Sequence, residues 1–215
     1  MKNKIIESIL ENKIVVIVRG VAKEKLIPLA EAMYSGGIRL LEITYSADGS
    51  VADEETASRI AMLAKHFEGR MYIGAGTVLT EKQVELTKNA GGNFIISPDT
   101  NADVIKKTVA LGLVSMPGAL TPSEITAANR AGADFVKLFP ITSLGLDYVK
   151  AVRAPLSHVK LIAVGGIHDG NVRDYLGAGV CGFGIGSNII DKKLIEAEDY
   201  AGITVLAKKY TEAIK

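Results

Sequence analysis

The sequence predicts a single α/β domain, a (β/α)8 TIM barrel with an extra N-terminal helix, over residues 1–215. Apolar runs of strand length alternate with helix-like segments, which is typical of parallel βα units. Eight such runs occur within 215 residues, and both numbers match one closed barrel. The runs are almost continuously apolar, as strands covered on both faces should be. No linker or low-complexity segment divides the chain.

The elements follow one another in a regular order. We expect a helix over residues 3–11 and then strands over residues 14–18, 38–43, 71–75, 93–96, 112–116, 134–138, 160–164 and 180–185. Segments with glycine, such as Ser35–Gly37, precede several of these strands, because glycine suits the left-handed end of a helix. Thr80–Gln83 and Thr121–Glu124 fit the capping box that starts a helix, and Pro122 stands at the favoured first helical position.

An open, doubly wound sheet is the main alternative, since it is also built from alternating strands and helices. The barrel is favoured because no Gly-x-Gly-x-x-Gly fingerprint follows the first expected strand. Many open sheets also lack this fingerprint, so the choice between the two folds depends equally on the number of strands.

The composition excludes several kinds of partner. The 25 basic and 24 acidic residues leave a formal net charge of +1 with no long block of one sign, so we expect neither nucleic acid nor a membrane as partner. A single cysteine, Cys181, excludes an internal disulfide framework and is most simply a buried core thiol. Residues 1–7 lack the apolar core of a signal peptide, and no stretch is long and apolar enough to span a membrane. A cytoplasmic protein is therefore expected.

Lys137 lies in an apolar run, Phe135–Pro140, that predicts a buried strand. Removing an ammonium group from water is costly, so burial lowers the pKa of a lysine, and a neutral amine can attack a carbonyl. Lys137 therefore indicates Schiff-base chemistry. The alternative is a lysine whose stem packs in the core while its amine reaches solvent.

Polar residues at the ends of other strands should meet Lys137, because a barrel gathers its functional side chains at the C-terminal ends of its strands. The first strand ends at Arg19, the second carries Glu42 and Thr44, and the third ends at Thr77. Each has a structural explanation, as an exposed cation, an ion-pair partner of Lys137 or a helix cap. Together, an inward lysine, an inward carboxylate and a strand-end arginine favour catalysis.

Glycines follow the last two expected strands, at the usual phosphate site of this fold. Gly165 and Gly166 follow the seventh strand, and Gly186 and Ser187 follow the eighth. Glycine lets backbone N–H groups approach an anion, so phosphate binding is the better interpretation, with tight turns as the alternative. The histidines lie far apart without metal-ligand spacing, which predicts surface or loop positions and no metal: His66, His158 and His168.

The ordered set of strand-end motifs resembles the 2-keto-3-deoxy-6-phosphogluconate (KDPG) aldolase and 4-hydroxy-2-oxoglutarate (KHG) aldolase family. The motifs are Ile17–Arg19, Leu41–Thr44, Gly74–Leu79, Ile96–Pro98, Met116–Gly118, Val136–Pro140 and Val164–Ile167, and they span nearly the whole chain. The resemblance implies a class I aldolase that needs no metal or cofactor and is usually a homotrimer. Such an enzyme cleaves a 2-keto-4-hydroxy acid to pyruvate and an aldehyde.

The resemblance also implies roles for individual residues. The Schiff-base lysine falls on Lys137 and the general acid/base on Glu42. The expected substrate-binding residues are Arg19, Thr44, Thr77, Pro98 and Phe139. The expected phosphate-binding residues are Gly165, Gly166, Gly186 and Ser187.

Two positions depart from the pattern of some family members. Ser46 stands where those members carry an arginine shortly after the Glu-x-Thr motif. We therefore assign the anion-binding cation to Arg19, which would hold either the pyruvate carboxylate or the phosphate. Val164 stands where some members have a threonine before the glycine pair, which removes one hydroxyl near the phosphate loop.

The expected function is cleavage of KDPG, KHG or both, to pyruvate plus glyceraldehyde 3-phosphate or glyoxylate. The galactonate epimer, 2-dehydro-3-deoxy-6-phosphogalactonate, is an alternative substrate. Two alternatives come from other classes: a phosphate-binding barrel isomerase or synthase, and a non-catalytic barrel that binds a phosphorylated metabolite. Both would explain the glycine loops, but an isomerase or synthase would not explain Lys137.

Overall fold

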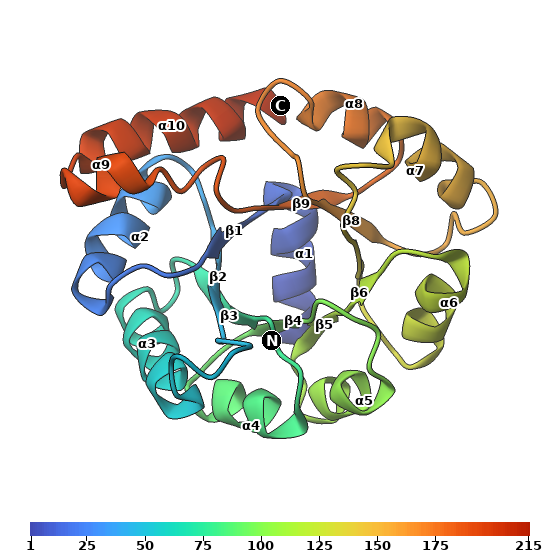
Figure 1. Ribbon diagram of the computed structural model, residues 1–215, viewed down its shortest axis with the longest axis horizontal. Coiled ribbons are helices and arrows are strands. Elements are labelled where there is room, and N and C mark those ends of the chain that lie inside the picture. The colour runs from blue at the N-terminus through green and yellow to red at the C-terminus, as the bar shows by residue number, and fades with distance from the viewer.

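Nine parallel strands form one sheet that curls into a barrel, with helices around the outside (Figure 1). The computed structural model describes residues 1–215. The strands are β1 (Ile14–Val18), β2 (Leu40–Thr44), β3 (Tyr72–Gly76), β4 (Phe94–Ile96), β5 (Val114–Met116), β6 (Gly118–Ala119), β7 (Val136–Leu138), β8 (Leu161–Val164) and β9 (Gly182–Ile185). The helices are α1 (Lys2–Asn12), α2 (Leu26–Ser35), α3 (Asp53–His66), α4 (Glu81–Asn89), α5 (Ala102–Ala110), α6 (Pro122–Arg130), α7 (Gly145–Arg153), α8 (Val172–Gly177), α9 (Lys192–Glu196) and α10 (Tyr200–Ala213), with a 3-10 turn, η1 (Lys23–Lys25), before α2.

The sheet closes on itself. The strand order is β5-β4-β3-β2-β1-β9-β8-β7-β6, and β1 pairs in parallel with both β2 and β9. The two outermost strands in this order, β5 and β6, are separated only by Pro117 in the chain. Across this break, the Lys137 N–H donates to the Pro117 carbonyl at 2.8 Å and the Phe135 N–H to the Ser115 carbonyl at 3.2 Å. The predicted barrel is confirmed, and the open doubly wound sheet is excluded.

The strand boundaries differ from the prediction in two ways. The strand predicted over 112–116 is β5, and a further short strand that was not predicted, β6, follows it after Pro117, which has no N–H to donate to the ladder. Several strands also begin later than predicted. For example, β2 begins at Leu40, since the N–H of Ile38 donates to the Met33 carbonyl at 3.0 Å and so closes α2 instead of joining the sheet.

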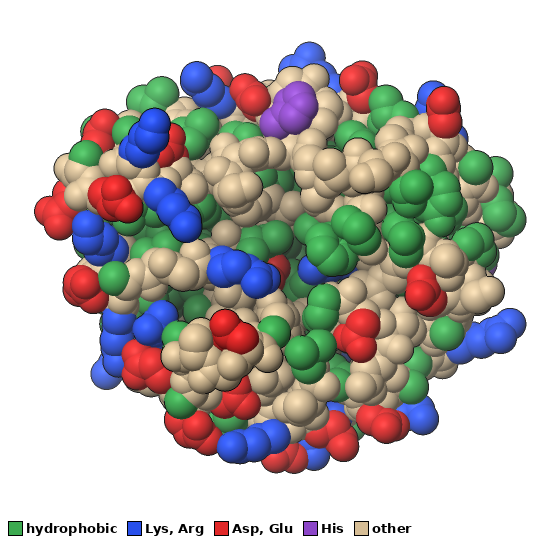
Figure 2. All heavy atoms as spheres, viewed as in Figure 1, with side chains coloured by type: hydrophobic (Ala, Val, Ile, Leu, Met, Phe, Trp, Pro, Cys, Tyr) green, Lys and Arg blue, Asp and Glu red, His purple; other side chains and the backbone are tan.

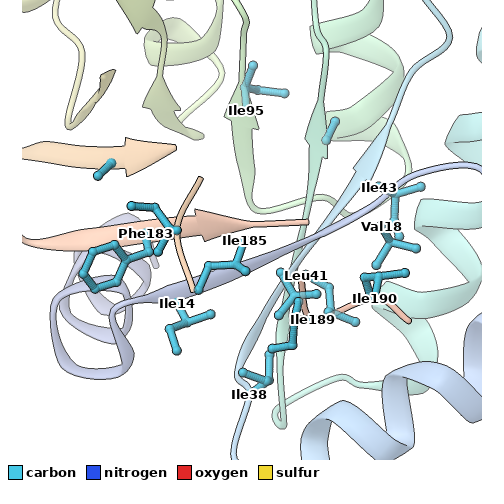
Figure 3. Packing of buried hydrophobic residues seen from close by; sticks show 14 of the residues in the cluster. Ile14, Val18, Ile38, Leu41, Ile43, Ile95, Phe183, Ile185, Ile189 and Ile190 are labelled. Carbon is cyan, nitrogen blue, oxygen red and sulfur yellow. The ribbon is translucent and has the colours of Figure 1, made fainter. Parts of the chain in front are cut away.

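Two apolar layers hold the barrel together. The outer cluster has 50 buried residues between the strands and the surrounding helices, among them Ile14, Leu41 and Ile43 (Figure 3). The inner cluster has 11 buried residues, including Val15 and Leu40. Neighbours in a strand fall into different clusters, because successive side chains point to opposite faces of a sheet.

The first helix, α1, closes one end of the barrel. Ile5 and Ile9 of α1 belong to the inner cluster. Lys13 joins α1 directly to the start of β1, and Lys2 forms a 2.9 Å ion pair with Asp134, just before β7. The helix therefore lies across the N-terminal ends of the strands (Figure 1), which confirms the extra N-terminal helix and leaves the C-terminal ends as the open mouth.

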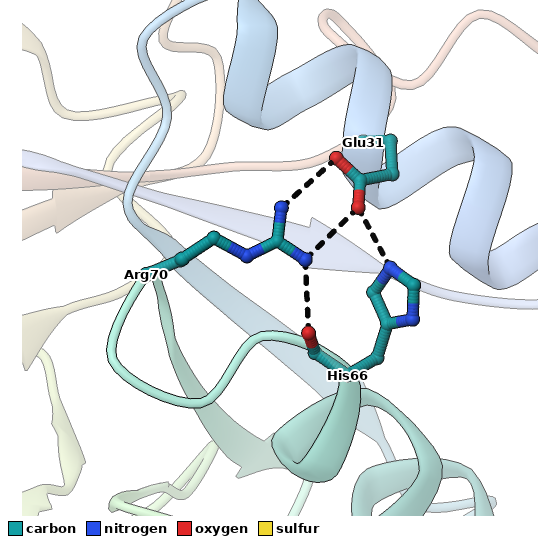
Figure 4. A network of polar contacts seen from close by, with 3 residues as sticks. All are labelled: Glu31, His66 and Arg70. Carbon is teal, nitrogen blue, oxygen red and sulfur yellow. Dashed lines mark hydrogen bonds and ion pairs between the residues drawn. The ribbon is translucent and has the colours of Figure 1, made fainter.

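Polar contacts join the outer helices at the surface. Glu31 of α2 accepts a hydrogen bond from Arg70 at 3.0 Å, and its carboxylate lies 2.7 Å from His66 Nε2 at the end of α3 (Figure 4). The hydrogen bond with His66 lowers the pKa of Glu31 most, and the hydrogen bond with Arg70 is the second cause. His66 therefore has the surface role expected from the sequence. None of the helices is both long and apolar enough to cross a bilayer.

Candidate active site

The C-terminal ends of four strands carry the polar side chains singled out in the sequence. Arg19 follows β1, Glu42 lies in β2, Thr77 follows β3, and Lys137 lies in β7. Ile17 is in register with Glu42 and Thr44 with Gly76, so Arg19, Glu42 and Thr77 lie at adjacent strand ends. The charges of Lys137 and Arg19 both lower the pKa of Glu42. Figure 2 shows a hollow in the middle of the molecule with basic and acidic side chains gathered in it. The fold thus brings together residues that are far apart in the chain.

Lys137 is a buried lysine, with 8% of its surface exposed. Its Nζ lies 4.5 Å from the centre of the Phe139 ring. Burial lowers the pKa of Lys137 below the ordinary lysine value, outweighing the opposing effect of Glu42, and Arg19 lowers it further. Whether burial or Glu42 dominates could not be decided from the sequence. Because burial is the larger effect, the amine is more easily neutral and nucleophilic than an exposed lysine.

Glu42 is buried more deeply still, with 2% of its surface exposed. Its Oε2 has no hydrogen-bond partner. Burial raises the pKa of the Glu42 carboxyl, and the charges of Lys137 and then Arg19 oppose this. Glu42 and Lys137 form no ion pair within 4.0 Å, so the structural alternative of a closed ion pair does not describe them. A carboxyl with a free oxygen and a raised pKa is suited to accept and to donate a proton.

Arg19 and Thr77 form a second polar pair at the mouth. The guanidinium of Arg19 donates a hydrogen bond from Nη2 to Thr77 Oγ1 at 2.9 Å. Thr77 has a left-handed backbone with φ of 56°, which is uncommon for a β-branched residue and carries strain. Strain of this kind persists where the surrounding structure imposes it, often at a binding site. The pair places a guanidinium and a hydroxyl side by side, and a carboxylate could bind to both.

Arg19 also borders two cavities at the mouth of the barrel. The larger one, of about 720 Å³, is lined by Arg19, Gly186, Ser187, Lys192 and Lys193, among others. The smaller one, of about 370 Å³, lies along the loop after β2, and its lining includes Arg19, Thr44, Ser46 and Arg59. Arg19 thus shares the larger cavity with Gly186 and Ser187 and the smaller one with Thr44.

The remaining predicted residues lie elsewhere around the mouth. Gly165 and Gly166 have left-handed backbones, with φ of 104° and 67°, and a Cβ on Gly165 would lie 2.8 Å from Thr142 Oγ1. They do not line the larger cavity with Gly186 and Ser187. Pro98 follows β4, and its carbonyl leaves no room for a side chain on Gly118 of β6.

Sequence reasoning missed several residues of this region. Lys192 and Lys193 line the larger cavity, and two adjacent lysines five residues after Ser187 were the available signal. Thr142 lies beside the glycine pair after β8, and its place two residues after Pro140 was the available signal. Gly76, at the end of β3, was missed as well: a Cβ there would overlap the Glu42 carboxyl, and this contact between two strands has no sequence signal.

Cys181 is a structural thiol rather than a nucleophile. It is partly buried, and its Sγ donates to the Leu161 carbonyl at 3.2 Å. Burial raises the pKa of the Cys181 thiol to about 11, so the reactive thiolate is scarce near neutral pH. The structure brings no three His, Cys, Asp or Glu side chains together as a candidate metal centre.

Comparison with known proteins gives this arrangement a family. The profile described as KDPG and KHG aldolase matches residues 5–206. A probable 2-dehydro-3-deoxy-6-phosphogalactonate aldolase from Rhizobium meliloti is 35% identical over 181 residues, covering 84% of this chain and 82% of the relative. A KHG/KDPG aldolase from Escherichia coli is 34% identical over 212 residues, covering 97% of this chain and 96% of the relative.

The solved structures agree with the sequence comparison. A KDPG aldolase from Legionella pneumophila, crystallised with pyruvate captured at low pH as a covalent carbinolamine intermediate, has a TM-score of 0.84 and 27% identity to this chain. The match covers 94% of this chain and 96% of that structure. The fold, the site at its mouth and these relatives lead to one assignment: the chain belongs to the KDPG and KHG aldolase family and is an aldolase, a lyase.

Proposed function

We propose that Lys137 forms a Schiff base with the C2 carbonyl of a 2-keto-4-hydroxy acid and that Glu42 transfers the protons of the cleavage. The observation that carries this proposal is a buried lysine of lowered pKa near a buried carboxyl whose Oε2 has no partner. Covalent catalysis needs a neutral amine, and proton transfer needs an acid/base whose oxygen is free. The barrel presents both groups at one mouth.

The reaction begins at Lys137. Its neutral Nζ attacks C2 of the substrate, and loss of the C2 oxygen as water leaves a protonated imine. The iminium accepts the electron pair of the C3–C4 bond as this bond breaks, which gives an enamine on Lys137 and an aldehyde from C4. Protonation of the enamine at C3 and hydrolysis of the imine then release pyruvate and restore the free amine.

Glu42 serves each proton transfer in this sequence. As a carboxylate it takes the proton of the C4 hydroxyl, directly or through one water, while the C3–C4 bond breaks. As a carboxylic acid it assists the departure of water during imine formation. Burial of Glu42 supports this dual use, because the raised pKa brings its protonated form closer to neutral pH.

The pyruvate carboxylate would bind to Arg19 and Thr77. Their 2.9 Å hydrogen bond places a guanidinium next to the threonine that the family resemblance gives to pyruvate. Arg19 also takes the place of the arginine that some family members carry where this chain has Ser46. This favours the carboxylate over the phosphate as the partner of Arg19.

Arg19→Gln should weaken pyruvate binding. A charged hydrogen bond contributes about 1.5–3 kcal/mol, so the apparent affinity should fall roughly 10- to 100-fold. The measurement is the pyruvate concentration that gives half-maximal borohydride trapping on Lys137. Arg19→Lys is the matched variant, since it keeps the charge and loses the two-pronged geometry. An unchanged pyruvate affinity, with weaker binding of KDPG, would instead assign Arg19 to the phosphate.

The phosphate of a phosphorylated substrate would lie in the larger cavity. Gly186 and Ser187 line it, and its basic residues, Arg19, Lys192 and Lys193, outnumber its one acidic residue, Asp191. Neither lysine forms an ion pair. The positive charge supports a phosphorylated substrate despite Val164. Gly165 and Gly166, next to Thr142, are the neighbouring backbone donors proposed for the same anion.

The substrate is proposed to be KDPG or KHG, with the galactonate epimer as the second candidate because a relative named for it is 35% identical. Comparison of all three in one assay coupled to pyruvate release distinguishes them. The preferred acid should have the largest kcat/KM, and a clear preference for KHG would contradict the phosphate site.

Borohydride reduction in the presence of pyruvate tests the Schiff base itself. The imine on Lys137 should be reduced to a stable secondary amine, and peptide mass spectrometry should find the added mass on Lys137 alone. Labelling of another lysine, or none, would overturn the proposal. An isomerase or synthase barrel, or a barrel that only binds a phosphorylated metabolite, would give no label.

The homotrimer and the cytoplasmic location stay predictions. The trimer follows from the family resemblance alone, and light scattering of the purified protein would measure its mass. A mass of one or two chains would contradict it.

A further inference from the structure

Gly76, the last residue of β3, leaves the space that the Glu42 side chain occupies. A Cβ built on Gly76 would overlap Oε1 and Cδ of Glu42 and would lie 2.6 Å from its Cγ. These three are the nearest atoms to that Cβ, so the close obstacles all belong to one side chain. Real Cβ contacts are essentially never shorter than 3.0 Å. No side chain can stand at position 76 while Glu42 keeps its place.

The backbone at Gly76 does not itself require glycine. Gly76 lies in a strand and is absent from the residues of positive φ, unlike Gly165 and Gly166. Alanine is therefore allowed there by the main chain. The contact with Glu42 is what excludes it.

The position of the carboxyl depends on packing rather than on hydrogen bonds. Oε2 of Glu42 is buried without a partner, although most buried polar atoms have one. Glu42 and Gly76 lie on neighbouring strands, where Glu42 is in register with Gly74, two residues before Gly76. Gly76 therefore lies on the same face of β3 as Gly74 and one pleat closer to the mouth.

We propose that Gly76 is a positioning residue for the general acid/base. The missing Cβ lets the Glu42 side chain lie against the end of β3, where its oxygens stay free to exchange protons with the substrate instead of being held by protein donors. The catalytic part of this inference rests on the role proposed above for Glu42. The steric part stands on the geometry alone.

Gly76→Ala should separate imine formation from cleavage. The new Cβ displaces the Glu42 carboxyl, and the three atoms nearest to it belong to Glu42 and none to Lys137, so turnover of KDPG should fall roughly 10²- to 10³-fold, within the range typical of a lost acid/base. Borohydride with pyruvate should still label Lys137 completely after long incubation. A variant with turnover within a factor of three of the wild type would overturn the proposal.

A double-mutant cycle tests the contact independently of catalysis. Gly76→Ala alone should lower the melting temperature by roughly 5 °C, as overpacking does in a domain of this size. The same change should cost about 1 °C or less in a Glu42→Ala background, because the obstacle has been removed. If Gly76→Ala alone fails to fold, recovery of a folded protein by Glu42→Ala supports the proposal equally.

Gly184→Ala is the matched control. Gly184 of β9 also lies in a strand without positive φ, but its Cβ would meet Val164 Cγ2 at 2.8 Å and Ile17 Cδ1 at 3.3 Å. Its effect on the melting temperature should be the same in the wild type and in the Glu42→Ala background. An equal loss for Gly76→Ala in both backgrounds would overturn the steric proposal. If Glu42→Gln keeps normal turnover while the coupling between positions 76 and 42 is still measured, Glu42 has no catalytic role, and only the packing contact with Gly76 stands.

Discussion

Replacement of Lys137 by methionine should lower kcat/KM for aldol cleavage by a factor on the order of 10⁵, because the covalent route through the imine is lost. Methionine is close to lysine in length and suits the buried, apolar surroundings of β7 next to Phe139. The folded barrel should therefore persist. The measurement is pyruvate release from KDPG in a coupled assay, with circular dichroism and thermal unfolding of the same sample.

Lys160→Met is the control for this variant. Lys160 directly precedes β8, is exposed, and has its Nζ 5.8 Å from the centre of the Phe135 ring. Lys160→Met makes the same chemical change at the N-terminal end of a barrel strand, away from the mouth, so turnover should stay near that of the wild type. Activity of Lys137→Met within tenfold of the wild type would contradict Schiff-base catalysis by this residue.

Glu42→Gln should lower kcat by about 10²- to 10⁴-fold, the usual contribution of a positioned general acid/base. Glutamine keeps the shape of the side chain against Gly76 but cannot carry the proton of the C4 hydroxyl. The extent of pyruvate trapping on Lys137 at long times should change little, because the amine and the carboxylate-binding pair are untouched. Stopped-assay turnover and borohydride trapping of the same preparation measure the two effects separately.

The same substitution should move the pH dependence of imine formation. Glu42 raises the pKa of Lys137 against the larger lowering by burial. Loss of that carboxylate therefore lowers the pKa of Lys137 further, so the neutral amine persists to lower pH. The acid limb of the trapping rate, measured from about pH 5 to pH 9, should shift to lower pH. A shift to higher pH would contradict the electrostatic coupling.

Glu31→Gln serves as the control for Glu42→Gln. It removes a surface carboxylate that bonds to His66 and Arg70, far from the strand ends of the mouth. Its turnover and its trapping profile should match the wild type. If Glu42→Gln keeps near-normal turnover and Lys137 is still required, Glu42 is not the general acid/base, and water or the substrate itself carries the protons.

The sequence was sufficient to predict the barrel and the burial of Lys137, because both depend on local patterns. An apolar run records burial on both faces of a strand, and a lysine inside such a run is conspicuous. The boundaries were less accessible. Ile38 is apolar like the strand that follows, yet its N–H closes the preceding helix, and only the hydrogen bond to Met33 reveals this. Pro117 was visible, but not that the sheet continues on both sides of it.

The sequence indicates which residues to consider for the site, but not the contacts between their side chains. Arg19, Glu42 and Lys137 could each be selected as polar groups at strand ends. That Arg19 donates to Thr77, and that burial outweighs Glu42 at Lys137, depends on distances between separate strands. Lys192 and Lys193 do not follow a strand directly and were not selected from the sequence; only the cavity that they line connects them with the site. Such information lies in the packing of elements, which no single segment encodes.

The inner apolar cluster fills the barrel, and α1 covers the N-terminal ends of the strands, so the polar strand-end residues are open to solvent only at the C-terminal mouth. Substrate and both products of the proposed reaction would therefore use that mouth, with the pyruvate half proposed to be bonded to Lys137. In the proposed mechanism the aldehyde, which is not bonded to the protein, leaves before the pyruvate that is still attached to Lys137. Because α1 covers the opposite end of the barrel, both releases would take place at this mouth.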